Sequence, residues 1–249
     1  MRALRILLIL VIVFGGLFVA ADRAAVYFAE GQVADKIKSS QGLTTDPQVS
    51  IKGFPFLTQI LGSSLDEVDI SLDGVSASAD GHNVEVTDVQ AELRDVTIDS
   101  SFSSATAATA NGSAHISYAD LAKSAPKGAS VGYAGAERAA KGQVKLSGSL
   151  TEVLEGAGIA VPDTVRALLG GQTVTAYSTV SLEGGNTVRL RAEDLPQLPV
   201  PGLNDQVRDV VNYDLKIDGM PSTIKLDKVV AAEDGLRFSG TGTDVSLSG

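Results

Sequence analysis

Histidines and hydroxyl groups are the first side chains to consider for catalysis in this sequence of 249 residues. Hydrolysis by a Ser–His–Asp arrangement needs a nucleophile beside a histidine that an acid orients. The two histidines are His82, in the turn-like segment Asp80-Gly81-His82-Asn83, and His115, in an alternating apolar–polar segment. These settings favour ordinary structural roles for both. We therefore expect no catalytic residue and no enzyme activity.

Carboxylates are concentrated in the segment Leu65–Val75, where they suggest a calcium site or a glycosidase acid pair. Glu67, Asp69 and Asp73 alternate with aliphatic residues, so they share one face of a strand. A solvated acidic face explains this pattern better than a metal site does. The sequence also contains no P-loop and no complete dinucleotide fingerprint. We expect neither a metal nor a cofactor.

The segment Gly53–Leu61, GFPFLTQIL, holds two of the seven phenylalanines, and a proline separates them. One interpretation is the end of a strand that tucks aromatic side chains into the core. The other is an apolar lip at the mouth of a cavity or a membrane-facing edge. The residues alone leave both interpretations open.

The N-terminus determines the compartment. Arg2 and Arg5 precede an uncharged apolar run of 16 residues, Ile6–Ala21. A membrane-spanning helix needs about 20 apolar residues, whereas the core of a signal peptide has about 7 to 15. The length of this run lies between the two. We favour a retained signal-anchor (residues 1–21), with a cleaved signal as the alternative. In both cases residues 22–249 form one extracytoplasmic domain, because the basic residues keep the short N-terminus inside.

The net charge and the cysteine content exclude several classes of partner and of covalent or metal site. The chain has 20 basic and 30 acidic residues, a net charge of −10, which argues against nucleic acid as a partner. Overall charge does not hold such a domain on anionic lipid, so contact with lipid requires apolar surface or a local basic patch. The absence of cysteine excludes disulfides, thiolate metal sites and a lipid-modified cysteine.

Hydrophobic periodicity predicts the elements. A helix is expected over Asp22–Ser39, ended by Gln41-Gly42 and nearly continuous with the apolar run. Residues 84–98 alternate in three phases, which predicts a long strand with bulges near Asp88 and Asp95. Further strands are expected at Ala105–Ile116, Gln143–Leu150, Gln172–Leu182, Thr187–Ala192, Thr223–Ala231 and Leu236–Leu247, with hairpins at 183–186 and 233–235. Short helices are expected after Ser117, over Pro162–Leu169 and over Leu203–Val211.

Together these elements predict an α+β fold in which a strongly curved antiparallel sheet carries a few short helices. One face of the sheet is apolar. Either the helices fill the space over that face or an elongated apolar cavity remains, and the residues alone do not distinguish these outcomes.

Two segments of the sequence resemble the LmeA-type phospholipid-binding family of actinobacterial envelope proteins. The first is VSIKGFPFLTQILGSSLDEVDISLDGV, residues Val49–Val75, and the second combines LPQLPVPGL (Leu195–Leu203) with DGLRFSGTGTDVSL (Asp234–Leu247). The resemblance covers nearly the whole exported part. Residues 100–142 depart most from it, because they contain the low-complexity run SSFSSATAATANGSA.

The resemblance implies a tubular lipid-binding fold, similar to half of the bactericidal/permeability-increasing protein, in which a curved sheet wraps around helices. It implies non-catalytic binding of phospholipid, with phosphatidylinositol-type lipids favoured, and a link to lipomannan biogenesis in the cell envelope or periplasm. The expected partners are therefore a phospholipid ligand and a membrane.

On this basis we expect an apolar chain-binding region with an entrance formed by the GFPFLTQIL segment. The predicted lipid-contacting residues are Phe54, Phe56, Leu57, Ile60, Leu61, Val68, Ile70, Leu72, Val84, Val86, Leu203, Val207, Val210 and Val211. The alternative is a membrane-anchored structural or partner-binding envelope domain with a fully packed core.

Overall fold

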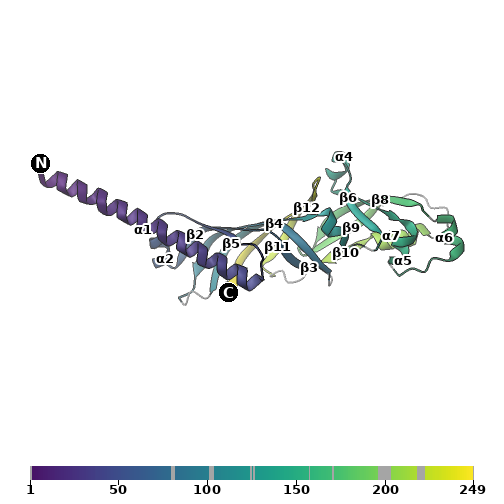
Figure 1. Ribbon diagram of the computed structural model, residues 1–249, viewed down its shortest axis with the longest axis horizontal. Coiled ribbons are helices and arrows are strands. Elements are labelled where there is room, and N and C mark those ends of the chain that lie inside the picture. Colours follow the sequence, from purple (N-terminus) through teal and green to yellow (C-terminus); the bar gives the residue numbers. More distant parts are fainter. Residues whose placement is uncertain are drawn as a thin grey trace. The chain divides into compact units, whose positions relative to one another are not determined.

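The computed structural model describes residues 2–79, 82–100, 104–123, 125, 127–156, 158–169, 171–195, 203–217 and 222–248. The helices are α1 (Arg2–Gln41), α2 (Phe56–Leu61), α3 (Tyr118–Lys123), α4 (Ala136–Ala139), α5 (Leu150–Gly156), α6 (Asp163–Leu169) and α7 (Leu203–Val211). The strands are β1 (Gln48–Lys52), β2 (Ser64–Leu72), β3 (Val75–Ala79), β4 (His82–Ile98), β5 (Ser104–Ser117), β6 (Ala129–Tyr133), β7 (Gln143–Ser149), β8 (Thr173–Glu183), β9 (Thr187–Asp194), β10 (Tyr213–Lys216), β11 (Ile224–Ala231) and β12 (Gly235–Ser248). Figure 1 labels these elements.

The chain divides into two compact units. Unit 1 contains residues 1–73, 90–111 and 242–249, and unit 2 contains residues 74–89 and 112–241. The long strands β4, β5 and β12 contribute residues to both units. The expected single domain over residues 22–249 stays a prediction.

The strands form antiparallel sheets, one of them strongly curved, so the predicted α+β class is confirmed. One sheet has the order β1-β2-β4-β5-β12-β11, with β3 also paired to β4, and the other has the order β10-β9-β8-β7-β6. Both predicted hairpins are present. Glu183 pairs with Thr187 across the first, and the amide of Ala232 donates to the carbonyl of Gly235 across the second, at 2.8 Å.

Helix α1 is one continuous helix of 40 residues, in agreement with the expectation that the helix over Asp22–Ser39 is nearly continuous with the apolar run. Its first half extends away from the strands of unit 1 (Figure 1), and its second half lies against β1 and α2. Val26 is buried there, and Glu30 accepts a hydrogen bond from the amide of Ile51 at 2.8 Å. The helix ends where expected, at Gln41, and the following Gly42 has a φ of 62°, which suits a glycine after a helix. Within the described residues, α1 is the one helix long and apolar enough to cross a membrane.

Strand β4 carries the predicted irregularities. Asp88 and Asp95 have φ values of 49° and 51°, the left-handed conformation that marks a bulged residue. Buried positions change phase at both, because Val84 and Val86 are buried before the first and Leu93 and Val96 lie on either side of the second. The prediction of bulges at these two aspartates is confirmed.

Several short elements were not predicted. The segment after β1 does not continue the strand: Gly53 and Pro55 turn the chain, and α2 begins at Phe56, which is buried in the core while Phe54 is exposed. The strand expected over Gln143–Leu150 ends at Ser149 because Leu150 is the first residue of α5. Elements α4, β3, β6 and β10 were also missed, since each has only four or five residues and so too few for a periodic signal.

Candidate functional site

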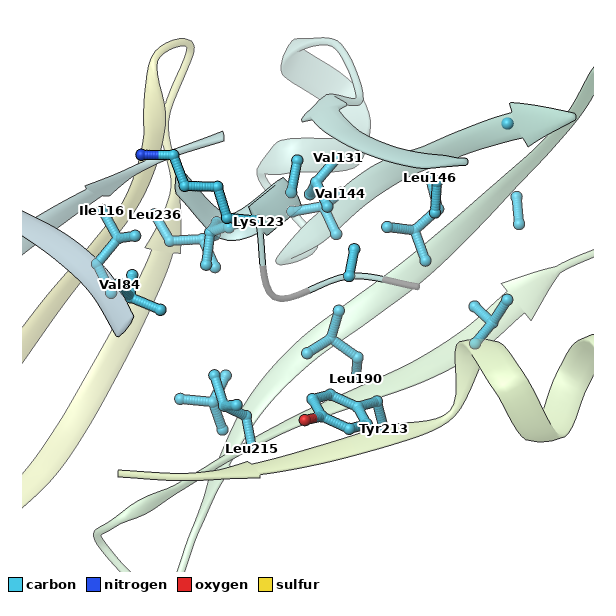
Figure 2. A pocket seen from close by; sticks show the side chains of 18 of the residues that line it. Val84, Ile116, Lys123, Val131, Val144, Leu146, Leu190, Tyr213, Leu215 and Leu236 are labelled. Atoms are coloured by element: carbon cyan, nitrogen blue, oxygen red, sulfur yellow. The ribbon is translucent and has the colours of Figure 1, made fainter. Parts of the chain in front are cut away.

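Unit 2 contains a cavity of about 890 Å³. This volume lies near the upper end of the range of about 300–1,000 Å³ that small-molecule pockets occupy. The described lining residues all belong to unit 2. Figure 2 shows aliphatic side chains from several strands converging on this space.

The wall that β7, β8 and β9 form follows from alternation along each strand. Side chains two residues apart point to one face of a sheet, and the antiparallel register places them beside one another. Leu146 pairs with Ala176, and both face the cavity. The aliphatic wall residues from these strands are Val144, Leu146, Val174, Ala176, Val188 and Leu190.

Further strands, helices and connecting segments contribute the rest of the described lining, including Ala129 and Val131 from β6, Tyr213 and Leu215 from β10 and Leu226 from β11. From β4, β5 and β12 it includes Val84, Val86, Ala114, Ile116, Leu236 and Phe238. From α3, α5 and α7 it includes Leu121, Ala122, Leu150, Val153, Val207 and Val211. Helices α5 and α7 are fixed by their own apolar cluster, in which Leu150 and Leu154 are 1% exposed and pack with Val161 and Val207.

Four of the residues predicted to contact lipid line this cavity: Val84, Val86, Val207 and Val211. The side chains of Leu203 and Val210 lie outside the described part of the chain. The remaining predicted residues all belong to unit 1 and are not among the described lining residues: Phe54, Phe56, Leu57, Ile60, Leu61, Val68, Ile70 and Leu72. Their contact with lipid, and the placing of Phe54, Phe56 and Leu57 at an entrance, stay predictions.

Sequence reasoning missed the wall of β7, β8 and β9 as a lining surface. The signal was present, since these strands had been predicted from the same alternation that nominated Val84 and Val86. Alternation predicts which face of a strand is apolar. It does not predict which apolar faces other side chains leave uncovered.

Polar groups on the described lining are few: Lys123, Lys127, Ser147 and Tyr213. The aliphatic stem of Lys123 contributes to the wall while its ammonium group turns away from the apolar side chains (Figure 2). That ammonium group donates to Asp120 Oδ1 at 2.5 Å. Hydrogen bonds from Lys123 and then from Ser117, whose Oγ lies 2.5 Å from Asp120 Oδ2, hold the pKa of Asp120 below its ordinary value. The same hydrogen bond raises the pKa of Lys123.

The group around Ser117 also confirms the predicted start of α3. Its Oγ accepts a hydrogen bond from the amide of Asp120 at 3.1 Å, as an N-cap side chain does.

His115 lies between a hydroxyl group and a carboxylate, as a catalytic histidine does, but its side chain does not face the cavity. Thr87 Oγ1 lies 3.0 Å from its Nδ1, and Asp234 Oδ1 lies 3.4 Å from its Nε2 with no hydrogen-bond geometry. Its neighbours on β5, Ala114 and Ile116, line the cavity, so alternation places His115 on the opposite face. The side chain of His82 lies outside the described part.

One serine has the spacing of a nucleophile elbow. The segment 128–132 reads Gly-Ala-Ser-Val-Gly, yet it enters strand β6 rather than the sharp strand-to-helix turn that such an elbow needs. Ser130 is exposed and its Oγ donates to the carbonyl of Ser147 at 2.8 Å. Because Ala129 and Val131 line the cavity, Ser130 points away from it.

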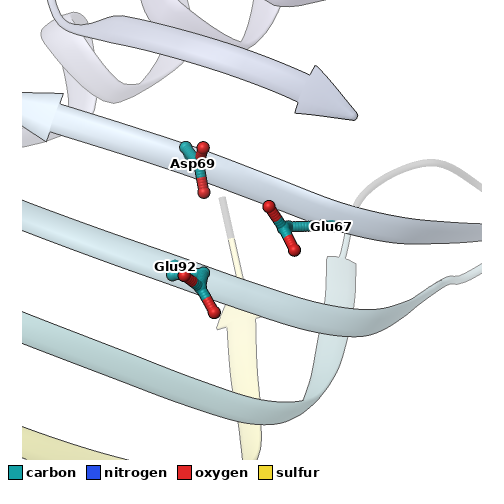
Figure 3. A group of neighbouring side chains, drawn as sticks. All are labelled: Glu67, Asp69 and Glu92. Carbon is teal, nitrogen blue, oxygen red and sulfur yellow. The ribbon is translucent and has the colours of Figure 1, made fainter. Parts of the chain in front are cut away.

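The carboxylates on the acidic face of β2, in unit 1, form ion pairs with nearby basic side chains. Oxygens of Glu67, Asp69 and Glu92 lie within 4.8 Å of one another (Figure 3). Arg94 pairs with Glu67 at 3.1 Å and with Glu92 at 2.6 Å, and Lys52 pairs with Asp69 at 3.3 Å. These cations neutralise much of the charge that a metal ion would otherwise balance.

Comparison with known proteins identifies one family. A family model described as LmeA-like phospholipid-binding matches residues 20–241. No curated protein and no solved structure matches the chain.

Proposed function

Because the chain belongs to the LmeA-like phospholipid-binding family, we propose that the cavity of unit 2 holds the acyl chains of a phospholipid. The observation that carries this proposal is the cavity itself, about 890 Å³ in volume and lined by aliphatic side chains. Among the described lining residues there is no aspartate, glutamate or histidine, which supports binding without catalysis.

The energetics favour a role in holding or carrying lipid. Keeping an acyl chain from water is worth about 0.8 kcal/mol per methylene, or roughly 12 kcal/mol for about fifteen carbons. A lipid in a bilayer already has this stabilisation, so a protein cavity gains little by extracting it. The cavity instead prevents the loss while the lipid is outside the bilayer, and contacts to the head group must supply selectivity.

The proposed head group, cellular process and membrane anchor rest on the sequence resemblance to the family and on the N-terminal residues. The resemblance supports phosphatidylinositol-type head groups and a contribution to lipomannan biogenesis in an actinobacterial envelope. The apolar run of α1, with Arg2 and Arg5 ahead of it, supports a retained membrane anchor with the remaining chain on the extracytoplasmic side.

The competing function was a structural or partner-binding envelope domain whose core is fully packed. A cavity of this size in unit 2 argues against that alternative, because protein interiors otherwise contain few voids larger than a water molecule.

Native mass spectrometry of the full chain, extracted from bacterial membranes in detergent, tests the proposal. The wild-type chain is expected to carry phospholipid adducts, identified by fragmentation. Leu146→Glu places a carboxylate in the cavity wall and is expected to lower occupancy more than tenfold, since an unpaired charge is costly in an apolar site.

Thr175→Glu is the matched control. Thr175 is exposed and lies between Val174 and Ala176, which both face the cavity, so its side chain points to the opposite face. Occupancy is expected to match the wild type. A lipid-free wild-type chain, or full occupancy in a folded Leu146→Glu chain, would refute the proposal.

A further inference from the structure

In unit 1, helix α2 and the residues that lead into it present large apolar side chains to solvent. Within the motif Gly53–Leu61, Phe56 is 4% exposed and belongs to the core, whereas Phe54 is 57% and Leu61 is 86% exposed. The motif therefore has an inner side that fixes it to unit 1 and an outer side that is largely exposed to solvent.

The position of α2 along α1 is fixed by hydrogen bonds at one level of the long helix. Asp22 has a fully buried side chain, and its Oδ1 accepts the amide of Leu57 at 2.9 Å. Arg23 Nη2 lies 2.5 Å from Asp22 Oδ2 and 3.4 Å from the carbonyl of Gly53. The start of α2 is thus fastened to the two residues that directly follow the apolar run Ile6–Ala21.

The residues at that level of α1 are of the types that are enriched where spanning helices cross the membrane–water boundary. Arginine and aromatic side chains gather where a spanning helix leaves the hydrocarbon, because each combines an apolar body with a polar tip or a polarisable ring. The guanidinium of Arg23 lies 5.3 Å from the centre of the Phe54 ring. Tyr27 and Phe28, just beyond on α1, are 82% and 68% exposed.

We infer that the surface made by Phe54, Leu61, Tyr27 and Phe28 lies in the interface of the bilayer that α1 spans. Unit 1 is then held on the membrane by two elements, the spanning part of α1 and the outer side of the motif Gly53–Leu61. The occupant of this surface is a lipid bilayer, because the surface continues directly from the apolar run. Apolar faces of such interfacial elements enter the boundary between head groups and acyl chains by about 5–10 Å.

The inference rests on the proposed retention of α1 in the membrane and is independent of what the cavity in unit 2 holds. It also gives the motif a role distinct from lining an entrance.

Site-specific fluorescence tests this inference, because the chain has no cysteine and each introduced cysteine is unique. The full chain is reconstituted in phosphatidylcholine–phosphatidylglycerol vesicles with an environment-sensitive label at Leu61→Cys, Leu10→Cys or Ser40→Cys. Leu61 and Leu10 are exposed, so neither substitution removes packing within the fold. Ser40 is an exposed control, about 27 Å along α1 from Asp22 at the helical rise of about 1.5 Å per residue.

The expected result is blue-shifted emission and quenching by nitroxide lipids at Leu10 and Leu61, with several-fold weaker quenching by aqueous iodide than at Ser40. A label at Leu61 that behaves like the label at Ser40, while Leu10 is in lipid, overturns the inference and leaves the anchor intact. Water-like behaviour at both Leu10 and Leu61 overturns the inference and the proposed anchor together. Phospholipid adducts in native mass spectra report on the cavity separately in the same variants.

Discussion

The two units use the same alternation of apolar and polar residues with different results. In unit 1 the dry face of β1 and β2 is covered, since Ile51 and Val68 are buried where α1 and α2 lie against these strands. In unit 2 the dry faces of β7, β8 and β9 meet a cavity. Alternation therefore determines which face of a sheet avoids water, and the elements laid over that face determine whether it becomes a packed core or the wall of a cavity.

Truncating one large side chain in each region gives the largest expected difference. Phe56→Ala removes a buried ring from the packed face of unit 1 and is expected to cost about 3–5 kcal/mol. Leu146→Ala enlarges an existing cavity and is expected to cost at most about 2 kcal/mol, because one side of Leu146 already lacks packing partners.

Urea denaturation of the detergent-solubilised chain, followed by circular dichroism, measures both values. Equal losses for the two variants would mean that Leu146 is as tightly packed as Phe56. The distinction between the units would then fail.

The second prediction concerns the rigidity of the strands beside the cavity. A Cβ added to Gly235 on β12 would collide with the carbonyl oxygen of Ile116 and lie 2.6 Å from His115 Nε2. Backbone and a buried ring cannot move aside cheaply, so Gly235→Ala is expected to lower the free energy of unfolding by about 1–3 kcal/mol.

Gly132→Ala on β6 is the control for that substitution, because an added Cβ there meets nothing within 4 Å. Its expected effect is within about 0.5 kcal/mol. The same denaturation experiment compares the two, and a Gly235→Ala chain as stable as Gly132→Ala would show that β5 and β12 separate readily beside the cavity.

The smallest effect at neutral pH is expected for Tyr118, which also makes the stability of unit 2 depend on pH. Burial raises the pKa of Tyr118 to about 12, above the ordinary value of about 10. A raised pKa means that the folded state holds the phenol proton more tightly. The stabilisation is therefore fully present below about pH 10 and is lost as the pH rises towards about 12.

Tyr118→Phe is expected to remove this alkaline loss, at a cost of about 1 kcal/mol at neutral pH for the hydrogen bond to the carbonyl of Ala232. Thermal melting between pH 8 and 12 measures it. An unchanged alkaline slope in Tyr118→Phe would assign the loss to other groups.

Sequence patterns predicted the long elements well, because each contains a long apolar run or an extended alternation of apolar and polar residues. The 40-residue helix, the bulges at Asp88 and Asp95 and the N-cap at Ser117 all follow from local chemistry. Helix α2 was missed because its six residues follow a proline and offer less than two turns of pattern.

The candidate site was predictable only in part. Val84, Val86, Val207 and Val211 were correctly placed on apolar faces, and the structure brings them together around the cavity. Ile70 has the same pattern but belongs to unit 1. No local pattern separates the two cases, since whether a face is filled depends on tertiary packing between segments far apart in the chain.

Photo-crosslinking tests the central claim most directly. A phosphatidylinositol with a diazirine near the end of one acyl chain is incubated with the membrane-embedded full chain, irradiated, and the adducts are mapped by peptide mass spectrometry. We expect adducts on peptides from β7, β8 and β9, whose side chains line the cavity. Adducts confined to unit 1, with none in β7, β8 or β9, would contradict the assignment of the cavity as the lipid site.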